Sequence, residues 1–420
     1  MYALCDVNSM YASCEKVFDP TIRNRPVIVL TNNDGCICAA CHIAKQMGVG
    51  KKFVPYFQVK DELEKAGAVI RSSNYELYAD MSQRFMDTCT PFAPHSHIYS
   101  IDECFLYYGV KYVPATGWHE HAKRIRRTVW KHVRLPISVG IGPTPTLAKA
   151  ASHAAKRLDG FRGVAVIDSP QIRQQILSQM AVTDIWGIGR KLGQRLNELG
   201  IYSAWDLSCT PTGLIKKQFN TLTQSTVEEL NGTVKLSWDD VRAPKKEFFS
   251  TRSFGQRVTD KNQLRQAVIT HVEIAARKLR QQKSLAKHLL VFASNSPHDT
   301  DLYYRRSLVH SFPTYTSDST IIATVANQLL NHIYSSGINF YKCGVGLLNL
   351  CPKEQHQLDL LIPNQDKEQL MSCIDAINSK YSRDTIFLAG RGIQQTFAMR
   401  REFLSPSFTT RLSQLPVIQC

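Results

Sequence analysis

The chain has 420 residues, a formal net charge of +16 and a sequence pI near 9.3. Hydrophobic residues make up 43% and charged residues 20%, which is typical of a soluble globular protein and excludes a disordered one. No run of about 18 apolar residues occurs, so we expect no membrane span. The first residues, MYALCDVNSM, lack a secretion signal. We therefore expect a cytoplasmic protein of about two to four domains, and its positive charge suits a polyanionic partner such as nucleic acid.

The first 165 residues alternate strand-like and helix-like segments. Strands are expected at YALCDVNSMY, RPVIVLT, PISVGIG and GVAVID. Helices are expected where apolar residues recur three or four positions apart, at YELYADMSQRFMDTC, HEHAKRIRRTVWKHV and TLAKAASHAAKRL. This alternation predicts an α+β layer with helices packed against a mixed sheet.

The stretch YSIDECF (99–105) places two adjacent carboxylates, Asp102 and Glu103, in a segment that otherwise reads as a buried strand. Neighbouring side chains on a regular strand point to opposite faces, so one charge would enter apolar surroundings unless the chain bends or a cation compensates. Asp6 lies in another apolar strand. If the three carboxylates meet, divalent cations are their natural partners. A two-metal carboxylate site is the apparatus of phosphoryl or nucleotidyl transfer.

Twelve cysteines are scattered without the spacing of a disulfide framework, so we expect reduced thiols. One cluster, CICAACH, allows two interpretations: a zinc site or cysteines of the core. Structural zinc sites use two separated ligand pairs, whereas this run is compact and apolar, which favours the core. Its members are Cys36, Cys38, Cys41 and His42.

Short helices broken by glycine are expected from about 170 to 235. Gly187 and Gly189, followed by Arg190, form a turn between two helical patterns. Such a turn can present backbone N–H groups and the positive end of a helix to a phosphate. It can equally be an ordinary helical hairpin whose glycines only permit the turn.

A polar segment, 231–249, is interpreted as a linker between domains. From about 250 to 350, two long helical patterns lie among strand-like runs, which predicts a small α+β domain. Between Lys245 and Leu350 there are 14 Lys and Arg against 6 Asp and Glu, a net charge of +8. A localised basic region favours a binding surface for nucleic acid. The last 70 residues look irregular and rich in turn residues.

Five stretches closely resemble the Y-family translesion DNA polymerases, above all the UmuC subfamily, in the same order and spacing along the chain: LCDVNSMYASCE, SSNYELYADMS, YSIDE, SVGIGPTPTLAKAASHAAK and DIWGIGRKLGQRL. The resemblance implies an α+β, multidomain right-hand polymerase with a helical thumb. Its parts would be a palm (1–18 and 78–168), fingers (19–77), a thumb with a helix-hairpin-helix (169–232), a linker (233–248), an α+β little finger (249–350) and a C-terminal partner-binding region (351–420).

The resemblance also implies roles for individual residues. Two Mg²⁺ ions, with the incoming deoxynucleotide, would be held by the catalytic residues Asp6, Asp102 and Glu103 and by the carbonyl of Val7. Tyr11 would be the steric gate, an aromatic ring that excludes a 2′-hydroxyl. Triphosphate contacts would come from Lys45 and Lys156, and DNA contacts from Gly187, Gly189 and Arg190. The chain departs from relatives at Asn8, where many have an acidic residue, and at Cys41 and His42, before Lys45.

The tail carries one short motif, QLDLL, which resembles the peptide with which bacterial polymerases bind the sliding clamp; as a bare pattern it could also be an amphipathic core fragment. The clamp would be bound by Gln357, Leu358, Leu360 and Leu361. The resemblance implies further partners: primer-template DNA, a processed UmuD-like accessory dimer and RecA.

These features predict an error-prone, template-directed DNA polymerase for translesion synthesis and SOS mutagenesis. A nucleotidyl cyclase would also use paired carboxylates, but it has no use for the glycine turn or the basic domain. A catalytically silent DNA-binding subunit that recruits repair partners is the second alternative. The three carboxylates argue against this alternative, because clustered buried charges cost free energy and a catalytically inactive site does not need them.

Overall fold

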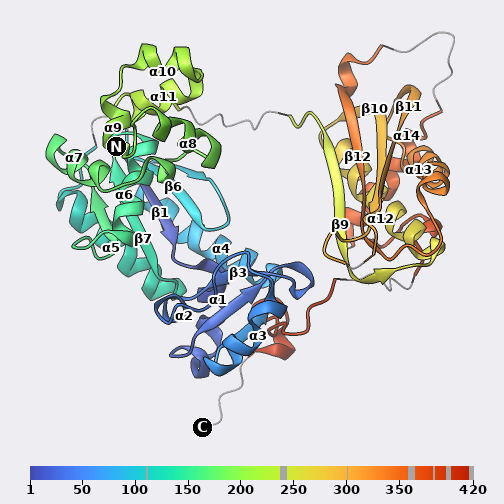
Figure 1. The fold of residues 1–420 in the computed structure, drawn as a ribbon, viewed down its shortest axis with the longest axis horizontal. Helices are drawn as coiled ribbons and strands as arrows, with labels where there is room; N and C mark the ends of the chain where they lie inside the picture. Colours follow the sequence, from blue (N-terminus) through green and yellow to red (C-terminus); the bar gives the residue numbers. More distant parts are fainter. Residues whose placement is uncertain are drawn as a thin grey trace. The chain divides into compact units, whose positions relative to one another are not determined.

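The computed structural model describes residues 1–109, 112–236, 244–299, 301–357, 365–381, 384–393 and 399–415. The chain forms two compact units (Figure 1). Unit 1 is Met1–Asp240 together with Arg401–Cys420, and unit 2 is Val241–Arg400. The predicted C-terminal region 351–420 is therefore divided between the two units. No helix among the described residues is long and apolar enough to cross a membrane.

The largest sheet of unit 1 has five strands in the order β5-β6-β1-β7-β8. Strand β1 runs antiparallel to β6 and β7, and β8 runs parallel to β7. The sheet is therefore mixed, in agreement with the alternation read from the sequence. Its strands are β1 (Tyr2–Val7), β5 (His95–Ile98), β6 (Glu103–Tyr107), β7 (Ile137–Gly142) and β8 (Val164–Val166).

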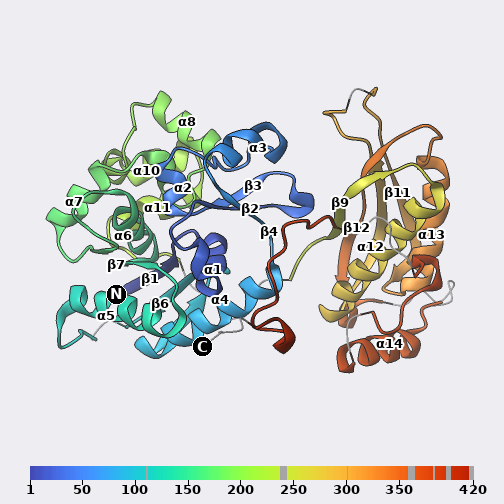
Figure 2. The ribbon, with the colours of Figure 1, turned by 90° about the horizontal axis from the view of Figure 1, so that it is seen from below.

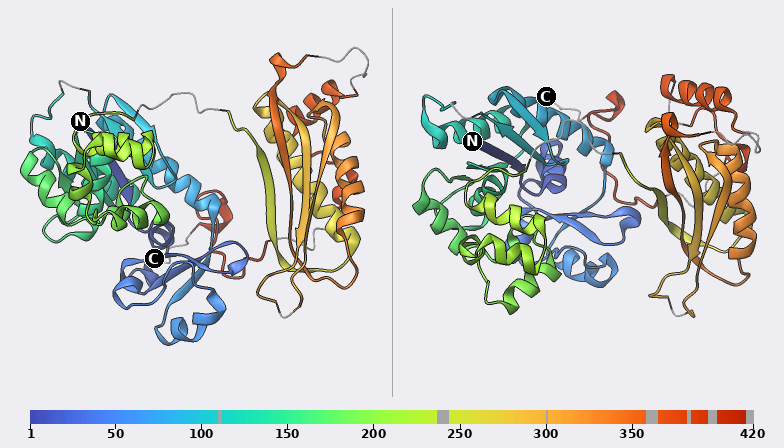
Figure 3. Two further views of the ribbon diagram at one scale, coloured as in Figure 1. Left: turned by 45° about the horizontal axis from the view of Figure 1, so that its top comes forward. Right: turned by 90° about the horizontal axis from the view of Figure 1, so that it is seen from above.

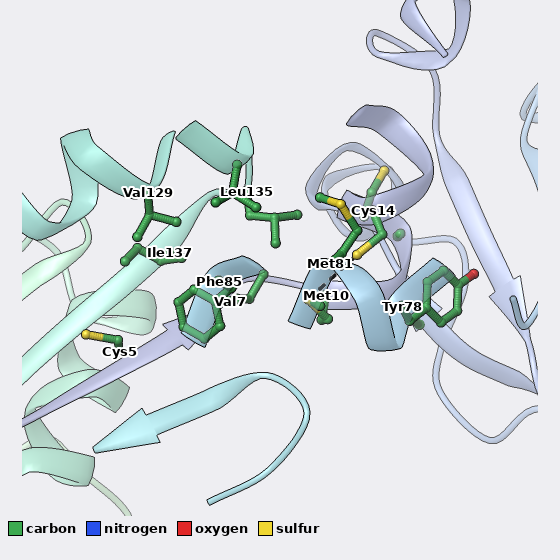
Figure 4. Packing of buried hydrophobic residues seen from close by; sticks show 14 of the residues in the cluster. Cys5, Val7, Met10, Cys14, Tyr78, Met81, Phe85, Val129, Leu135 and Ile137 are labelled. Carbon is green, nitrogen blue, oxygen red and sulfur yellow. Dashed lines mark hydrogen bonds between the residues drawn. The ribbon is translucent and has the colours of Figure 1, made fainter. Parts of the chain in front are cut away.

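Helices cover both faces of this sheet, and the residues of β1 alternate between them. Ala3, Cys5 and Val7 pack into one core with side chains such as Phe85 and Val129 (Figure 4). Tyr2 and Leu4 face the other way. The first core includes α1 (Met10–Phe18), α4 (Tyr75–Cys89) and α5 (Gly117–Val133), whereas α6 (Pro145–Arg157) packs on the opposite face.

A three-stranded sheet, in the order β3-β2-β4, forms the rest of the N-terminal part of unit 1. All four residues of β2 are buried. The elements of this part are η1 (Pro20–Ile22), β2 (Val27–Leu30), η2 (Asn32–Asp34), β3 (Ile37–Ala40), α2 (His42–Gln46), α3 (Tyr56–Lys65), β4 (Val69–Ser72) and, after α4, η3 (Thr90–Phe92).

Short helices follow β8, as the glycine-broken sequence predicts. They share a core with α6, in which Leu196, Leu207 and Val227 are fully buried. The elements are α7 (Pro170–Ser178), η4 (Val182–Asp184), α8 (Arg190–Glu198), α9 (Ala204–Cys209), α10 (Thr212–Gln218) and α11 (Thr221–Leu230).

Unit 2 is built on a four-stranded antiparallel sheet in the order β11-β10-β12-β9. Its two long helices lie against one face of the sheet (Figures 2 and 3). The elements are β9 (Phe248–Val258), α12 (Lys261–Gln281), β10 (Ser284–Ser294), β11 (Arg305–Thr316), α13 (Ser319–Ile333) and β12 (Phe340–Pro352). The region from about 250 to 350 therefore contains both strands and helices, as its sequence patterns indicated, within a unit that extends to Arg400.

The region after β12 is more regular than we expected, because it contains a helix of 13 residues, α14 (Glu368–Lys380). Leu370, Met371, Ile374 and Ile377 recur at helical spacing, a signal that sequence analysis missed. Only Met371 of this helix is buried, so the helix has little apolar packing. An ion pair holds it instead: Arg280 donates from Nε and Nη2 to the two carboxylate oxygens of Asp375, at 2.6 and 2.8 Å. Three short turns complete the chain: η5 (Lys353–Gln355), η6 (Ala389–Arg391) and η7 (Leu412–Gln414).

Candidate active site

Strand pairing brings the predicted carboxylates together at one end of β1. Asp6 is the direct partner of Glu103 in the antiparallel pair β1–β6, so their side chains lie on the same face. The N–H of Val7 donates to the carbonyl of Asp102 at 2.9 Å. The chain bends over residues 100–102 before β6 begins, so Asp102 is not part of a regular strand. Its carboxylate accepts a hydrogen bond from Ser100 Oγ at 2.6 Å.

Helix α6 supplies the cations that face these carboxylates. Lys156 Nζ is in direct contact with the carboxylate of Asp6. Lys149 Nζ lies 3.1 and 3.2 Å from the two carboxylate oxygens of Glu103. Sequence analysis missed Lys149. The signal was its spacing of seven residues from Lys156, which places both on one face of a helix.

The close approach of α6 to the sheet depends on glycine in β7. A Cβ on Gly140 would lie 2.1 Å from the backbone nitrogen of Ser152, and one on Gly142 would lie 2.8 Å from that of Ala148. Only strand residues without a side chain let the helix backbone pack so closely. The glycines of SVGIG therefore determine how near the two lysines come to β1.

The carboxyl group of Asp6 is crowded and mostly buried. Burial raises its pKa to about 6; the ammonium of Lys156 opposes this rise, and the charges of Glu103 and Asp102 add to it. Carboxylate oxygens are the ligands that Mg²⁺ prefers, so the donor set fits a divalent cation in its chemistry. Across the described ranges, however, no three Asp, Glu, His or Cys side chains converge into one metal-binding group. The lysines and Ser100 occupy these oxygens instead.

A cavity of about 1390 Å³ opens beside this end of β1. Its lining combines an acidic end with basic side chains contributed by the helices. Lys45, on α2, donates to Ser9 Oγ at 2.7 Å. Burial and then the nearby Lys52 and Lys156 lower the pKa of Lys45. Among the predicted site residues, the lining includes Asp6, Val7, Tyr11, Lys45, Asp102 and Lys156, but not Glu103.

Tyr11 projects from α1 and is half-buried. Its ring is stacked on that of Tyr78, with centroids 4.5 Å apart and planes 14° apart, and it meets Tyr75 edge-on at 6.2 Å. Burial raises the pKa of Tyr11 to about 12, so its phenol is neutral at physiological pH. Tyr11 therefore packs against a core aromatic, labelled in Figure 4, and lines the cavity as well.

The predicted glycine turn lies just before α8. Gly187 has φ +91°, a conformation that favours glycine, and Gly189 is the N-cap of α8. Gly187, Gly189 and Arg190 are all exposed. The preceding Trp186 donates from Nε1 to the hydroxyl of Tyr99 at 3.0 Å, so the turn is anchored beside the segment that carries Asp102.

Two predictions remain: the cysteines of CICAACH and the tail motif QLDLL. Cys41 is buried and is the N-cap of α2, and Cys38 donates to the carbonyl of Val29 at 3.2 Å. Gln357 is described, but Leu358, Leu360 and Leu361 lie outside the described residues.

Several proteins are similar in sequence to this chain over nearly its whole length. Protein UmuC of Salmonella typhimurium is 41% identical over 424 residues, covering 99% of each chain, and protein MucB of Escherichia coli is 38% identical over 422 residues, again covering 99% of each. This chain belongs to the UmuC-like family of Y-family DNA polymerases. The model of the impB/mucB/samB family matches residues 5–153, and that of its C-terminal domain matches 245–360.

Two further models match parts of this UmuC-like chain. The helix-hairpin-helix motif of the same family covers residues 171–201, and a domain of unknown function covers 368–418. A more distant relative, DNA polymerase IV of Pelotomaculum thermopropionicum, is 26% identical over 396 residues, 92% of this chain and 94% of that one.

Solved structures confirm the predicted fold class. A Y-family DNA polymerase chimera of Dbh and Dpo4 is 21% identical and matches 83% of this chain and 98% of its own, with a TM-score of 0.62. An insertion ternary complex of Dbh DNA polymerase, also 21% identical, covers the same shares with a TM-score of 0.51. The UmuC-like chain therefore has the α+β multidomain fold of the Y-family polymerases.

Proposed function

We propose that this UmuC-like chain is an error-prone, template-directed DNA polymerase for translesion synthesis and SOS mutagenesis. One observation carries the proposal: a single cavity is lined by the carboxylates of Asp6 and Asp102, the aromatic ring of Tyr11 and the ammonium groups of Lys45 and Lys156. A nucleotidyl transferase needs this combination, because it must bind a polyanionic nucleotide beside metal-binding carboxylates.

Asp6, Asp102, Glu103 and the carbonyl of Val7 would hold two Mg²⁺ ions. The bound metals would supply neutralisation of charge on the transferring phosphoryl group and activation of the primer 3′-hydroxyl. The chain itself has to release Asp6 and Glu103 from Lys156 and Lys149. Each lysine then becomes available to a phosphate, which it can bind as a compact positive charge.

Tyr11 is proposed to select the sugar. Its ring faces the cavity and is backed by the buried Tyr78, so it cannot retreat from a ribose 2′-hydroxyl without moving a core residue. Lys45 and Lys156 come from helices on different parts of unit 1, and both line the cavity. This arrangement suits the binding of the triphosphate of an incoming deoxynucleotide.

Primer-template DNA is proposed to bind through its backbone, which fixes position without reading sequence. Exposed basic side chains on β9 and β11 (Arg252, Arg305 and Arg306) suit this role, as do the exposed turn of Gly187 and Gly189 and the first turn of α8. A roomy active site would tolerate damaged bases and discriminate poorly between correct and incorrect pairs.

Partner contacts are proposed for the C-terminal region. The peptide Gln357–Leu361 would bind the sliding clamp through its apolar side chains. The 41% identity to protein UmuC supports an accessory dimer of the UmuD type, and RecA is proposed as a further partner. The alternative function, a silent recruiting subunit, has less support because Asp6 and Asp102 line the cavity and Glu103 is paired with Asp6.

The test is primer extension on an abasic template, with Mg²⁺ and four deoxynucleotides, in the presence of the accessory dimer, RecA and the clamp. Wild type is compared with Asp102→Asn, which removes a charge with little change of shape. We expect synthesis by the wild type only, with DNA affinity of the two proteins within a few-fold.

Two results would count against the proposal. If Asp102→Asn synthesised DNA at the wild-type rate, the carboxylate of Asp102 would not be needed for catalysis. No synthesis by either protein, with DNA binding intact, would favour the silent recruiting subunit.

A further inference from the structure

Residues 401–415 of the last described segment belong to unit 1, and they lie at the end of a region that matches a domain of unknown function. Four polar side chains of unit 1, each at least nine-tenths buried, take hydrogen-bond partners from this segment: Glu15, Asp34, Ser72 and Asn74. An unpartnered buried polar group costs free energy. The segment is therefore an integral part of unit 1.

Two of these contacts attach the segment beside the three-stranded sheet, at η2 and at the end of β4. The N–H of Glu402 donates to Asp34 Oδ2 at 2.8 Å. Phe403 exchanges hydrogen bonds with Ser72 at the end of β4: its carbonyl accepts from the Ser72 N–H, and its N–H donates to Ser72 Oγ, each at 3.0 Å. Asp34 also accepts from Ser72 Oγ at 2.6 Å. These bonds fix where the segment passes.

Ser405 follows and lies at the N-terminus of α4. Asn74, the N-cap of that helix, donates from Nδ2 to the carbonyl and to the Oγ of Ser405, at 3.2 and 3.0 Å. The side chain of Ser405 in turn donates to Glu15 Oε1 at 3.1 Å. Ser405 is only 5% exposed, so these contacts exclude water.

Glu15 connects Ser405 to the ring behind Tyr11. The hydroxyl of Tyr78 donates to the same oxygen, Glu15 Oε1, at 2.6 Å. The Glu15 side chain is 1% exposed, and the nearest cation, Arg71, has its Nε 3.6 Å from the other oxygen. Tyr78 is fully buried and its ring is stacked on Tyr11. An unbroken series of contacts thus runs from Ser405 through Glu15 and Tyr78 to Tyr11.

We propose that Ser405 is a positioning residue for sugar selection, acting through Glu15 and Tyr78 on Tyr11. This role rests on the proposed function, in which Tyr11 is the steric gate. In this role, a residue near the end of the domain of unknown function stabilises the position of the buried Glu15 carboxylate, which accepts a hydrogen bond from the Tyr78 hydroxyl. Without the Ser405 hydroxyl, Glu15 Oε1 keeps Tyr78 as its one hydrogen-bond donor among the described residues, and the ring behind Tyr11 is held less firmly.

The experiment measures the ratio of incorporation efficiencies for a deoxynucleotide and the matching ribonucleotide. The full-length chain is used, together with its accessory dimer, RecA and the clamp. Ser405→Ala should lower the ratio by about two- to tenfold, because only part of the free energy of this hydrogen bond reaches the ring of Tyr11 through Glu15 and Tyr78. The matched control is Leu404→Ala, a substitution of the neighbouring residue, which is 43% exposed and should keep the wild-type ratio.

A double-mutant cycle tests the route. Tyr78→Phe keeps the ring that stacks on Tyr11 but cuts its bond to Glu15, so it should lower the ratio by itself, even if Ser405→Ala proves too unstable to assay. Adding Ser405→Ala to Tyr78→Phe should then have no further effect. Equal effects of Ser405→Ala in both backgrounds would overturn the route through Tyr78.

Tyr11→Ala separates failure of this inference from failure of the proposed function. If Tyr11→Ala lowers the ratio and neither Ser405→Ala nor Tyr78→Phe does, Tyr11 is a gate but the tail does not position it. If Tyr11→Ala leaves the ratio unchanged, Tyr11 is not a steric gate, and the proposed role of Ser405 is wrong as well.

Discussion

Lys156 and Asp6 are in direct contact, which joins the last turn of α6 to the end of β1. This pair neutralises a carboxylate that is mostly buried. It also places the ammonium proposed to bind phosphate and the carboxylate proposed to bind metal at the same point of the cavity, so nucleotide binding and the release of Asp6 are expected to be linked.

Lys156→Ala should therefore lower the efficiency of nucleotide incorporation by about ten- to a hundredfold, because a hydrogen bond to a charged group is worth roughly 1.5–3 kcal/mol. Single-turnover kinetics over a range of deoxynucleotide concentrations would measure this efficiency. The control is Lys131→Ala, at an exposed lysine of α5 that does not line the cavity. If Lys156→Ala were as active as the wild type, Lys156 would not contribute to nucleotide binding.

Glu229, on α11, should be important for the stability of unit 1. It is fully buried and accepts hydrogen bonds from the N–H groups of Thr146 (3.1 Å), Lys235 (2.6 Å) and Leu236 (2.9 Å). Glu229→Ala would leave these donors without their acceptor, so the free energy of unfolding should fall by about 2–4 kcal/mol. Urea denaturation measures this change. Glu228→Ala, at the neighbouring glutamate near the surface, should change stability little.

His271 should make unit 2 sensitive to acid. Burial, with a smaller effect of Arg252, lowers its pKa to about 4 from the ordinary 6.5. Below about pH 6.5 His271 is protonated in the unfolded chain but stays neutral in the folded chain. The free energy of unfolding therefore falls as pH decreases towards 4. The total loss is roughly 3 kcal/mol. His271 lies 2.9 Å from the hydroxyl of Ser250, and His271→Gln should flatten the pH profile.

Urea unfolding at pH 7 and pH 4.5, followed by a brief pulse of hydrogen exchange on peptides from α12, would measure this effect in the full chain. His298→Gln, at an exposed histidine of unit 2, is the matched control and should keep the wild-type dependence. A wild-type profile for His271→Gln would contradict the prediction.

Replacing Leu360 and Leu361 with Ala should abolish stimulation by the sliding clamp and leave basal synthesis unchanged, because these apolar side chains are proposed to fill the clamp groove. Primer extension with and without the clamp is the measurement. Leu370→Ala, at an exposed leucine of α14 outside the motif, should retain stimulation. If the clamp stimulated both variants equally, its binding site would lie elsewhere on the chain.

Much of the fold could be read from local patterns. The apolar alternation of the first strand, the helical spacing of TLAKAASHAAKRL and the turn residues around Gly187 each depend on neighbours a few positions away, and the structure has elements at each. The residue types of Asp6, Asp102 and Glu103 also indicated the chemistry, because paired carboxylates in apolar segments require compensation. Helix α14 was not expected, although Leu370, Met371, Ile374 and Ile377 recur at helical spacing.

The sequence by itself determined most of the elements, the fold class and the carboxylates, because these follow from short-range periodicity and from the cost of burying charge. Only the tertiary structure decided which groups meet. The register of β1 against β6 sets Asp6 opposite Glu103, the glycines of β7 let α6 bring Lys149 to Glu103, and the returning tail brings Ser405 to Glu15. Contacts between residues far apart in the chain depend on strand register and packing, which no local pattern encodes.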